Sequence, residues 1–279
     1  MLARTQGDYV AARQFHEESL AIQRERGDRR GIAASLSGLG NVSLSLGDLP
    51  AGRSFLEQSL AIYRELGDRR ETANQLNNLG AAMAYAGDFP AARVIHEETL
   101  ALRRELGDRW GTAASLTNLA MVARNNGDLA AARELYQASE AIYQELGDPY
   151  CTARAWRQTA LVMCDQGDYE SAQSLLRKSL ASFLKLGDRT GICDSLYGLA
   201  YAFSLRDPRR AATLWGAGER LHEELGVRQP PIDRSRDERQ VAAARAALGD
   251  DTAFDLAWQE GRAMNVEHAV RYALDTGGS

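Results

Sequence analysis

The dipeptide Gly-Asp recurs every twenty residues over most of the chain. Its glycines stand at positions 7, 27, 47, 67, 87, 107, 127, 147, 167 and 187. Glycine readily adopts the left-handed backbone conformation that ends a helix, and the aspartate that follows can cap the N-terminus of the next helix. About seventeen residues separate successive pairs, which is enough for a helix of about 25 Å. The spacing therefore predicts a ladder of equal helices joined by short turns.

The segments between the Gly-Asp pairs carry the hydrophobic periodicity of helices. In residues 29–46, for example, Ile32, Leu36, Leu39 and Val42 follow one another at steps of three or four. Alternate segments are of two kinds, so the full repeating unit is a helical hairpin of forty residues, with a first helix (A-helix) and a second helix (B-helix). Since a lone hairpin cannot bury both apolar faces, neighbouring hairpins must stack. The sequence predicts an all-α protein of the α-solenoid class.

The repeat pattern divides the chain into three parts. Residues 1–26 are interpreted as a partial repeat with a lone B-helix, residues 29–225 as five hairpins, and residues 226–279 as a linker with C-terminal capping helices. The capping helices are expected near 236–248, 251–263 and 266–275. Because LARTQGD at the start of the chain is similar to VARNNGD at the end of a later A-helix, the chain begins inside a repeat. This predicts either an internal start or a piece of a longer protein.

Charge and cysteine content limit the kinds of partner and compartment. The net charge is −5, with 33 basic and 38 acidic residues, so the chain has no overall attraction to nucleic acid or to anionic lipid. Three cysteines without a CxxC pair favour a reducing compartment. No run of eighteen apolar residues is present, and the N-terminus has no apolar signal core. We expect a cytoplasmic protein with no membrane contact.

The helical unit contains a pattern of small residues around each Gly-Asp pair. It reads LGAAMAYAGDFPAA at 79–92, and similar segments stand at 39–52, 119–132 and 159–172. This pattern resembles the tetratricopeptide repeat (TPR), in the extended form found in kinesin light chain and LGN-type adaptors. The resemblance implies a right-handed superhelix of about five hairpins plus a half repeat and a helical cap. It also implies a concave face that is lined by the A-helices and binds a protein or peptide.

The C-terminal segment LGDDTAFDLAWQEGRAMNVEHAVRYAL supports a second resemblance. It is similar to the end of large bacterial signal-transducing ATPases, including LuxR-type transcriptional regulators, in which an ATPase module precedes a TPR array. The resemblance implies that this chain is the sensor or interaction arm of a larger bacterial regulator. The alternatives are a stand-alone TPR adaptor or scaffold and, less favoured, a nucleic-acid-binding protein that uses concave arginines.

No arrangement of catalytic or metal-binding residues stands out in the sequence. Neither Lys178 nor Lys185, the two lysines of the chain, follows the glycine-rich loop of a nucleotide-binding site. His16 and His96 occupy equivalent positions two repeats apart, which is too far for a shared metal ion. We expect a non-catalytic protein with no cofactor and no metal site.

The concave positions can be counted from the small residue of each A-helix. The predicted protein- or peptide-binding residues are Asn41, Asn74, Asn77, Asn78, Tyr85, Thr117, Asn118, Met121, Arg124, Asn125, Arg154, Arg157, Gln158, Asp194, Tyr197 and Tyr201. Side-chain amides can pair with the N–H and C=O groups of an extended peptide, and arginines can hold carboxylates. The alternative is that these polar residues only solvate an exposed surface. The N-terminal half repeat is a further candidate surface, for self-association.

Overall fold

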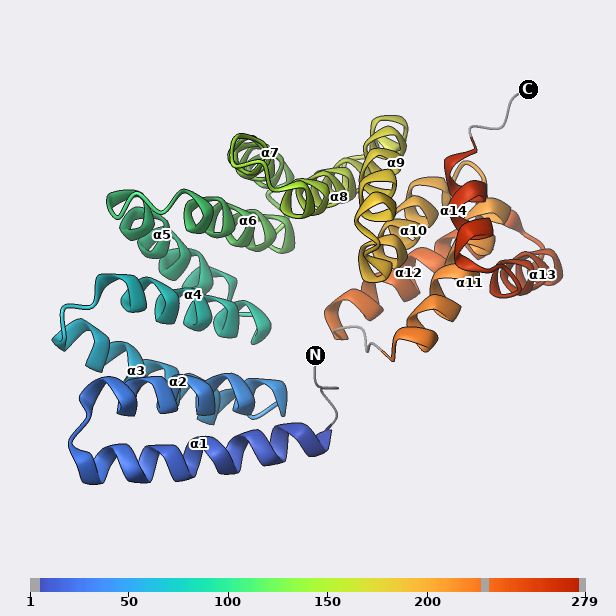
Figure 1. The fold of residues 1–279 in the computed structure, drawn as a ribbon. Coiled ribbons are helices and arrows are strands. Elements are labelled where there is room, and N and C mark those ends of the chain that lie inside the picture. Colours follow the sequence, from blue (N-terminus) through green and yellow to red (C-terminus); the bar gives the residue numbers. More distant parts are fainter. Residues whose placement is uncertain (1–5, 227–230, 276–279) are drawn as a thin grey trace. The chain divides into compact units, whose positions relative to one another are not determined.

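The structure, a computed structural model, describes residues 6–226 and 231–275, with the side chains of 9–226 and 237–275 (Figure 1). The described residues form helices joined by short turns and contain no strand, which confirms the predicted all-α solenoid class. In chain order the helices are α1 (Gln6–Arg26), α2 (Arg29–Ser45), α3 (Leu49–Glu65), α4 (Arg69–Tyr85), α5 (Phe89–Glu105), α6 (Arg109–Asn125), α7 (Leu129–Glu145), α8 (Pro149–Asp165), α9 (Tyr169–Leu186), α10 (Arg189–Phe203), α11 (Pro208–Leu225), α12 (Pro231–Leu248), α13 (Asp251–Arg262) and α14 (Val266–Leu274).

The Gly-Asp pairs form the turns between helices as the sequence predicts. Gly67 has a φ angle of 67°, in the left-handed region, and it follows the end of α3. The next residue, Asp68, accepts a hydrogen bond from the backbone N–H of Glu71 at 3.2 Å and so caps α4. Positive φ angles occur at every ladder glycine from position 27 to position 187. Each pair therefore ends one helix and begins the next.

The chain divides into two compact units, Met1–Leu135 and Tyr136–Ser279, and the boundary falls within α7. In the first unit, α1 to α6 pack against their neighbours in chain order, and the A-helix α4 also contacts the A-helices α2 and α6. Buried leucines such as Leu36, Leu56 and Leu76 fill the spaces between the helices. The three A-helices therefore share one side of this unit.

The A- and B-helices of the first unit approach closely at small residues. A methyl group built on Gly80 of α4 would lie 2.6 Å from Cε1 of His96 on α5, and one built on Gly40 of α2 would lie 2.7 Å from Cγ of Leu56 on α3. His96 is fully buried. In these two repeats, the glycine of the A-helix thus provides the space that a larger B-helix side chain fills.

The second unit contains the last two hairpins and the C-terminal helices. Its core surrounds Trp215 of α11, which is fully buried. Figure 1 shows α13 and α14 beside α11, and α13 approaches α11 closely because Gly216 and Gly261 lie against backbone carbonyl groups of the opposite helix. The carboxylate of Glu219 accepts hydrogen bonds from Nε1 of Trp258 at 2.8 Å and from Nη1 of Arg262 at 2.5 Å. The C-terminal helices therefore cover the last hairpin.

One helix boundary differs from the prediction. The helix expected from residue 236 begins at Pro231, so five residues assigned to the linker belong to α12. Proline is well tolerated in the first turn of a helix because its missing N–H has no partner there. The rest of the predicted linker, residues 227–230, lies outside the described residues. No helix in the described part of the chain has the length and apolar character needed to span a membrane.

Candidate functional site

The predicted concave residues of the first unit lie on α2, α4 and α6 and differ in exposure. Asn41, Asn74, Tyr85 and Met121 are exposed, and Arg124 is buried. The half-buried members are Asn77, Asn78, Thr117, Asn118 and Asn125. We call Asn41, Asn74, Asn77, Asn78 and Asn118 the amide surface. The first unit thus offers a set of accessible side-chain amides on helices that contact one another.

Two members of the amide surface are bonded to each other across neighbouring A-helices. Nδ2 of Asn118 on α6 donates a hydrogen bond to Oδ1 of Asn77 on α4 at 2.8 Å. This contact joins the side-chain amides of two successive repeats. Each carboxamide has two N–H donors and an oxygen with two lone pairs, so the bonded pair can still accept and donate further hydrogen bonds.

Helical periodicity explains why Asn77 and Asn78 remain partly exposed. Leu76 and Leu79 of α4 are 1% and 7% exposed and pack in the core of the unit. Asn77 and Asn78 stand between them in the sequence and are half-buried, at the margin of the side that the leucines bury. The position of the leucines in α4 therefore determines how far the neighbouring amides are exposed.

The two predicted ligand-binding arginines of the second unit, Arg154 and Arg157, already contact other side chains of the protein. Arg157 of α8 forms an ion pair with Asp194 of α10 at 3.2 Å, and both were among the predicted ligand-binding residues. Arg154 is exposed, and its guanidinium carbon lies 5.9 Å from the ring centroid of Tyr150. Gln158 is half-buried. The charge of Arg157 is therefore already balanced within the protein.

The two predicted tyrosines of α10 contact neighbouring helices. The hydroxyl of Tyr201 donates a hydrogen bond to Oδ1 of Asp165 at 3.0 Å. The ring of Tyr197 lies 5.1 Å from that of His222 on α11, and it occupies the space beside Gly218. Burial raises the pKa of both tyrosine hydroxyls. These two side chains contribute mainly to packing between helices, so less of their surface is open to a ligand.

Chemically reactive side chains are buried rather than gathered at a site. Cys151, Cys164 and Cys193 are buried free thiols, and burial raises the pKa of Cys151 to about 11, which disfavours the reactive thiolate. Over the described ranges, no group of three or more histidine, cysteine, aspartate or glutamate side chains is placed to hold a metal ion.

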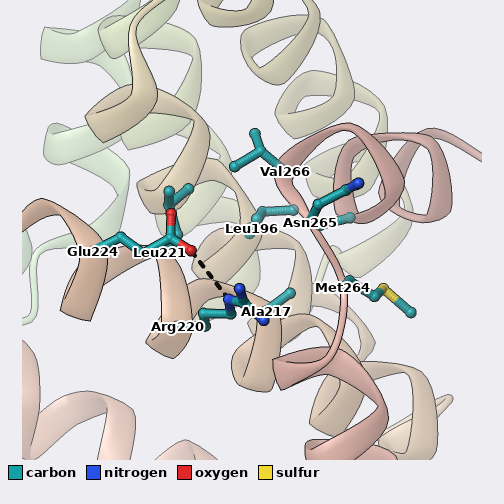
Figure 2. A pocket seen from close by; sticks show the side chains of 9 residues that line it. Leu196, Ala217, Arg220, Leu221, Glu224, Met264, Asn265 and Val266 are labelled. Carbon is teal, nitrogen blue, oxygen red and sulfur yellow. Dashed lines mark hydrogen bonds and ion pairs between the residues drawn. The ribbon is translucent and has the colours of Figure 1, made fainter.

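A cavity between α10, α11 and the start of α14 is too small for a ligand. Figure 2 shows its lining, which includes Leu196, Leu221 and Val266, with the ion pair of Arg220 and Glu224 beside it. Its volume of about 10 Å³ is near the minimum for one water molecule. The open A-helix face of the first unit is therefore the stronger candidate for binding.

The stacked hairpins, with accessible amides on the A-helices of the first unit, define a helical-repeat protein. The sequence model of the tetratricopeptide repeat matches residues 1–65, 31–105 and 111–185. The chain belongs to the tetratricopeptide repeat family. No curated protein matches it.

Several solved structures share the fold at low sequence identity. A putative kinesin light chain of Podosopora anserina with nearly identical TPR-like repeats is 21% identical, with a TM-score of 0.56, over 65% of this chain and 89% of that chain. A signal transduction ATPase with numerous domains and a tetratricopeptide repeat sensor, from Pyrococcus horikoshii, is 16% identical, with a TM-score of 0.63, over 84% of this chain and 36% of that chain. The Rap conjugation gene regulator of the plasmid pLS20, in complex with a Phr peptide, is 12% identical, with a TM-score of 0.53, over 96% of this chain and 80% of that chain.

These comparisons confirm the resemblance to tetratricopeptide repeats and to the kinesin light chain-like form. The solved structures establish the fold only, because their identities are low. The ATPase illustrates an architecture in which a chain of this fold is a minor part of a longer protein, since this chain spans 36% of its length.

Proposed function

We propose that this chain is a non-catalytic binding module that holds an extended peptide, or an extended segment of a protein, on the amide surface of the first unit. The hydrogen bond between Asn118 and Asn77 carries the proposal, because it places amides of successive repeats within reach of one another. An extended peptide presents alternating N–H and C=O groups along its length, and carboxamides can donate to and accept from both.

The residues around the amides favour a peptide over a small polar ligand. Tyr85 and Met121 are 56% and 37% exposed and stand on the same A-helices as the asparagines. Such side chains can contact apolar side chains of a peptide while the amides pair with its backbone. The Phr peptide complex of the pLS20 Rap regulator supports this choice of ligand class.

The experiment that tests this proposal begins with peptides selected from a random library on the intact chain. We expect the double substitution Asn78→Ala and Asn118→Ala to weaken a selected peptide about tenfold or more, because each lost amide contact leaves a peptide group unpaired. Gln58→Ala on α3 is the matched control, since Gln58 is an exposed amide on a B-helix. Equal affinities for the double variant and for the control would contradict the proposal.

We further propose that the chain is the sensor or interaction arm of a larger bacterial signalling or transcriptional regulator in the cytoplasm. The ATPase-like C-terminal sequence and the tetratricopeptide repeat sensor of the Pyrococcus horikoshii ATPase support this architecture. The alternative is a stand-alone adaptor. An immunoblot of the native protein decides between them, because an adaptor gives a band near 30.6 kDa and a regulator gives a much larger one.

A separate proposal concerns self-association through α1. Val10, Phe15 and Ile22 are 50%, 73% and 47% exposed on this helix, which packs against α2 on its other side. Apolar side chains at a repeat edge favour contact with a second copy. Sedimentation should show dimerisation that Phe15→Glu weakens, whereas a strict monomer at high concentration would contradict it.

A further inference from the structure

Two arginines of the B-helices converge on one aromatic ring in the second unit. The guanidinium carbon of Arg177 on α9 lies 5.8 Å from the centroid of the Phe203 ring, and that of Arg210 on α11 lies 4.6 Å from it. The ring stands at the end of α10 and is 7% exposed. We call Arg177, Phe203, Arg210, Tyr272 and Asp275 the guanidinium corner.

The two guanidinium groups are held differently. Arg210 donates hydrogen bonds from Nη2 to the backbone oxygen of Tyr272, at 2.8 Å, and to that of Asp275, so the end of α14 fixes its position. Arg177 has no hydrogen-bond acceptor and no ion-pair partner within residues 6–226 and 231–275. The Nε atoms of both arginines are buried without a partner. The corner therefore contains donors that the described part of the fold leaves unused.

The charges of the corner are also unbalanced. Burial lowers the pKa of Arg177, and the positive charge of Arg210 lowers it further, while Asp275 acts in the opposite direction. The carbonyl groups that hold Arg210 are neutral. Two neighbouring cations in a partly buried place repel each other, and a bound anion would offset that cost.

Guanidinium groups match one class of ligand particularly well. The planar fork of arginine donates parallel hydrogen bonds to two oxygens of a carboxylate or phosphate. We propose that the guanidinium corner binds an oxyanion, the phosphate or carboxylate group of a partner, through the guanidinium group of Arg177. The site is formed by residues of α9, α10 and α11 and by the end of α14, none of which belongs to the amide surface, and it does not rest on the peptide-binding proposal.

A purely structural role leaves Arg177 unexplained. Nε2 of Gln173 already connects α9 to the end of α10 through the backbone oxygen of Ala202, at 3.1 Å, and Arg210 already connects α11 to α14. Arg177 adds a positive charge and a ring contact, but no described hydrogen bond. An anion gives the unused donors of Arg177 their acceptor.

The test is an NMR titration of the full chain labelled with ¹⁵N-arginine, in which the Nε–Hε signals of Arg177 and Arg210 are followed. Inorganic phosphate and acetate are added separately, with chloride keeping the ionic strength constant. We expect a saturable shift of both signals at millimolar concentrations. A shift with phosphate alone identifies a phosphate site, and a shift with both ions identifies a general oxyanion site.

Three variants make the test specific. Arg177→Gln should weaken phosphate binding about tenfold, because it removes a charged donor. Asp275→Asn should tighten binding about threefold, because it removes a nearby negative charge. Arg209→Gln is the control and should change nothing, since Arg209 is exposed and pairs with Glu260 at 3.4 Å. Absence of a saturable shift in the unmodified chain, or unchanged affinity in both Arg177→Gln and Asp275→Asn, would overturn the proposal.

Discussion

Asn118 and Asn77, forty-one residues apart, are joined by a hydrogen bond of 2.8 Å between α6 and α4. The bond connects the A-helices of two successive repeats. It also aligns two amides that a peptide backbone could use. Its contribution to stability can therefore be measured separately from any contribution to binding.

We expect Asn118→Ala to lower the free energy of unfolding by about 1 kcal/mol, the usual contribution of a partly buried hydrogen bond. Asn77→Ala should cost a similar amount, and the double variant should cost less than the sum because the two side chains share one bond. Chemical denaturation of the four proteins measures this coupling. Asn74→Ala, an exposed asparagine of the same helix, is the control and should have almost no effect.

The contact between Gly80 and His96 predicts a second coupling. Gly80→Ala places a methyl group 2.6 Å from the imidazole ring, and overpacking of this kind costs about 1–3 kcal/mol. The cost should be smaller in a His96→Ala background, where space is available. If Gly80→Ala is equally destabilising with and without the imidazole ring, the cost does not come from this contact.

The same histidine predicts how stability depends on pH. Burial, together with the positive charge of Arg103, lowers the pKa of His96 to about 4, below its ordinary value of 6.5. The unfolded chain therefore binds a proton between these two values while the folded chain does not. This difference is a stability contribution of about 3 kcal/mol, present above pH 6.5 and lost as the pH falls to about 4.

Denaturation at about pH 7 and at about pH 4.5 measures this loss of stability. Between roughly pH 4 and 6.5 the folded and unfolded chains differ in the protonation of His96. His96→Leu should remove most of the loss, since Leu56 and Leu176 fill the equivalent position in other B-helices. The control is His268→Gln, an exposed histidine of α14. An unchanged pH dependence in His96→Leu would show that other groups cause the acid sensitivity.

Substituting a glycine in a Gly-Asp turn should lower stability through backbone conformation alone. Gly67 has a φ angle of 67° and no atom within 4 Å of an added methyl group. Gly67→Ala should therefore cost about 1–2 kcal/mol through backbone strain alone. Gly67→Asn should cost less, because asparagine tolerates the left-handed region better than alanine does. Equal melting temperatures for the glycine and alanine proteins would contradict this account of the turns.

The helices could be predicted from the sequence because their causes are local. Each Gly-Asp pair ends and begins a helix through contacts within a few residues, and the leucine spacing indicates which side is buried. The start of α12 at Pro231 was missed because proline next to another proline is typical of a linker, although it also fits the first turn of a helix.

The accessibility of the predicted ligand-binding side chains was harder to predict, because it depends on contacts with residues that are far away in the sequence. The partial exposure of Asn77 and Asn78 follows from the spacing of the neighbouring leucines. By contrast, the ion pair of Arg157 depends on Asp194 in the next A-helix, and the covering of Tyr197 depends on Gly218 and His222 in α11. No local pattern signals these contacts.

The guanidinium corner was missed for a similar reason. Arg177 and Arg210 stand thirty-three residues apart on helices that are not adjacent in the chain, and their convergence depends on where the end of α14 lies. In the sequence alone, each is one of many arginines on the polar side of a B-helix. The ligand-binding roles of the A-helix residues and the cytoplasmic location stay predictions.

Peptide binding at the amide surface is tested most sharply by an NMR titration of the side-chain amide signals with a library-selected peptide. The Nδ2 signals of Asn74, Asn78 and Asn118 should shift together and saturate at one peptide concentration, while the Nε2 signal of Gln58 on α3 should stay in place. Saturable shifts confined to residues outside α2, α4 and α6, with these asparagine signals unchanged, would contradict it.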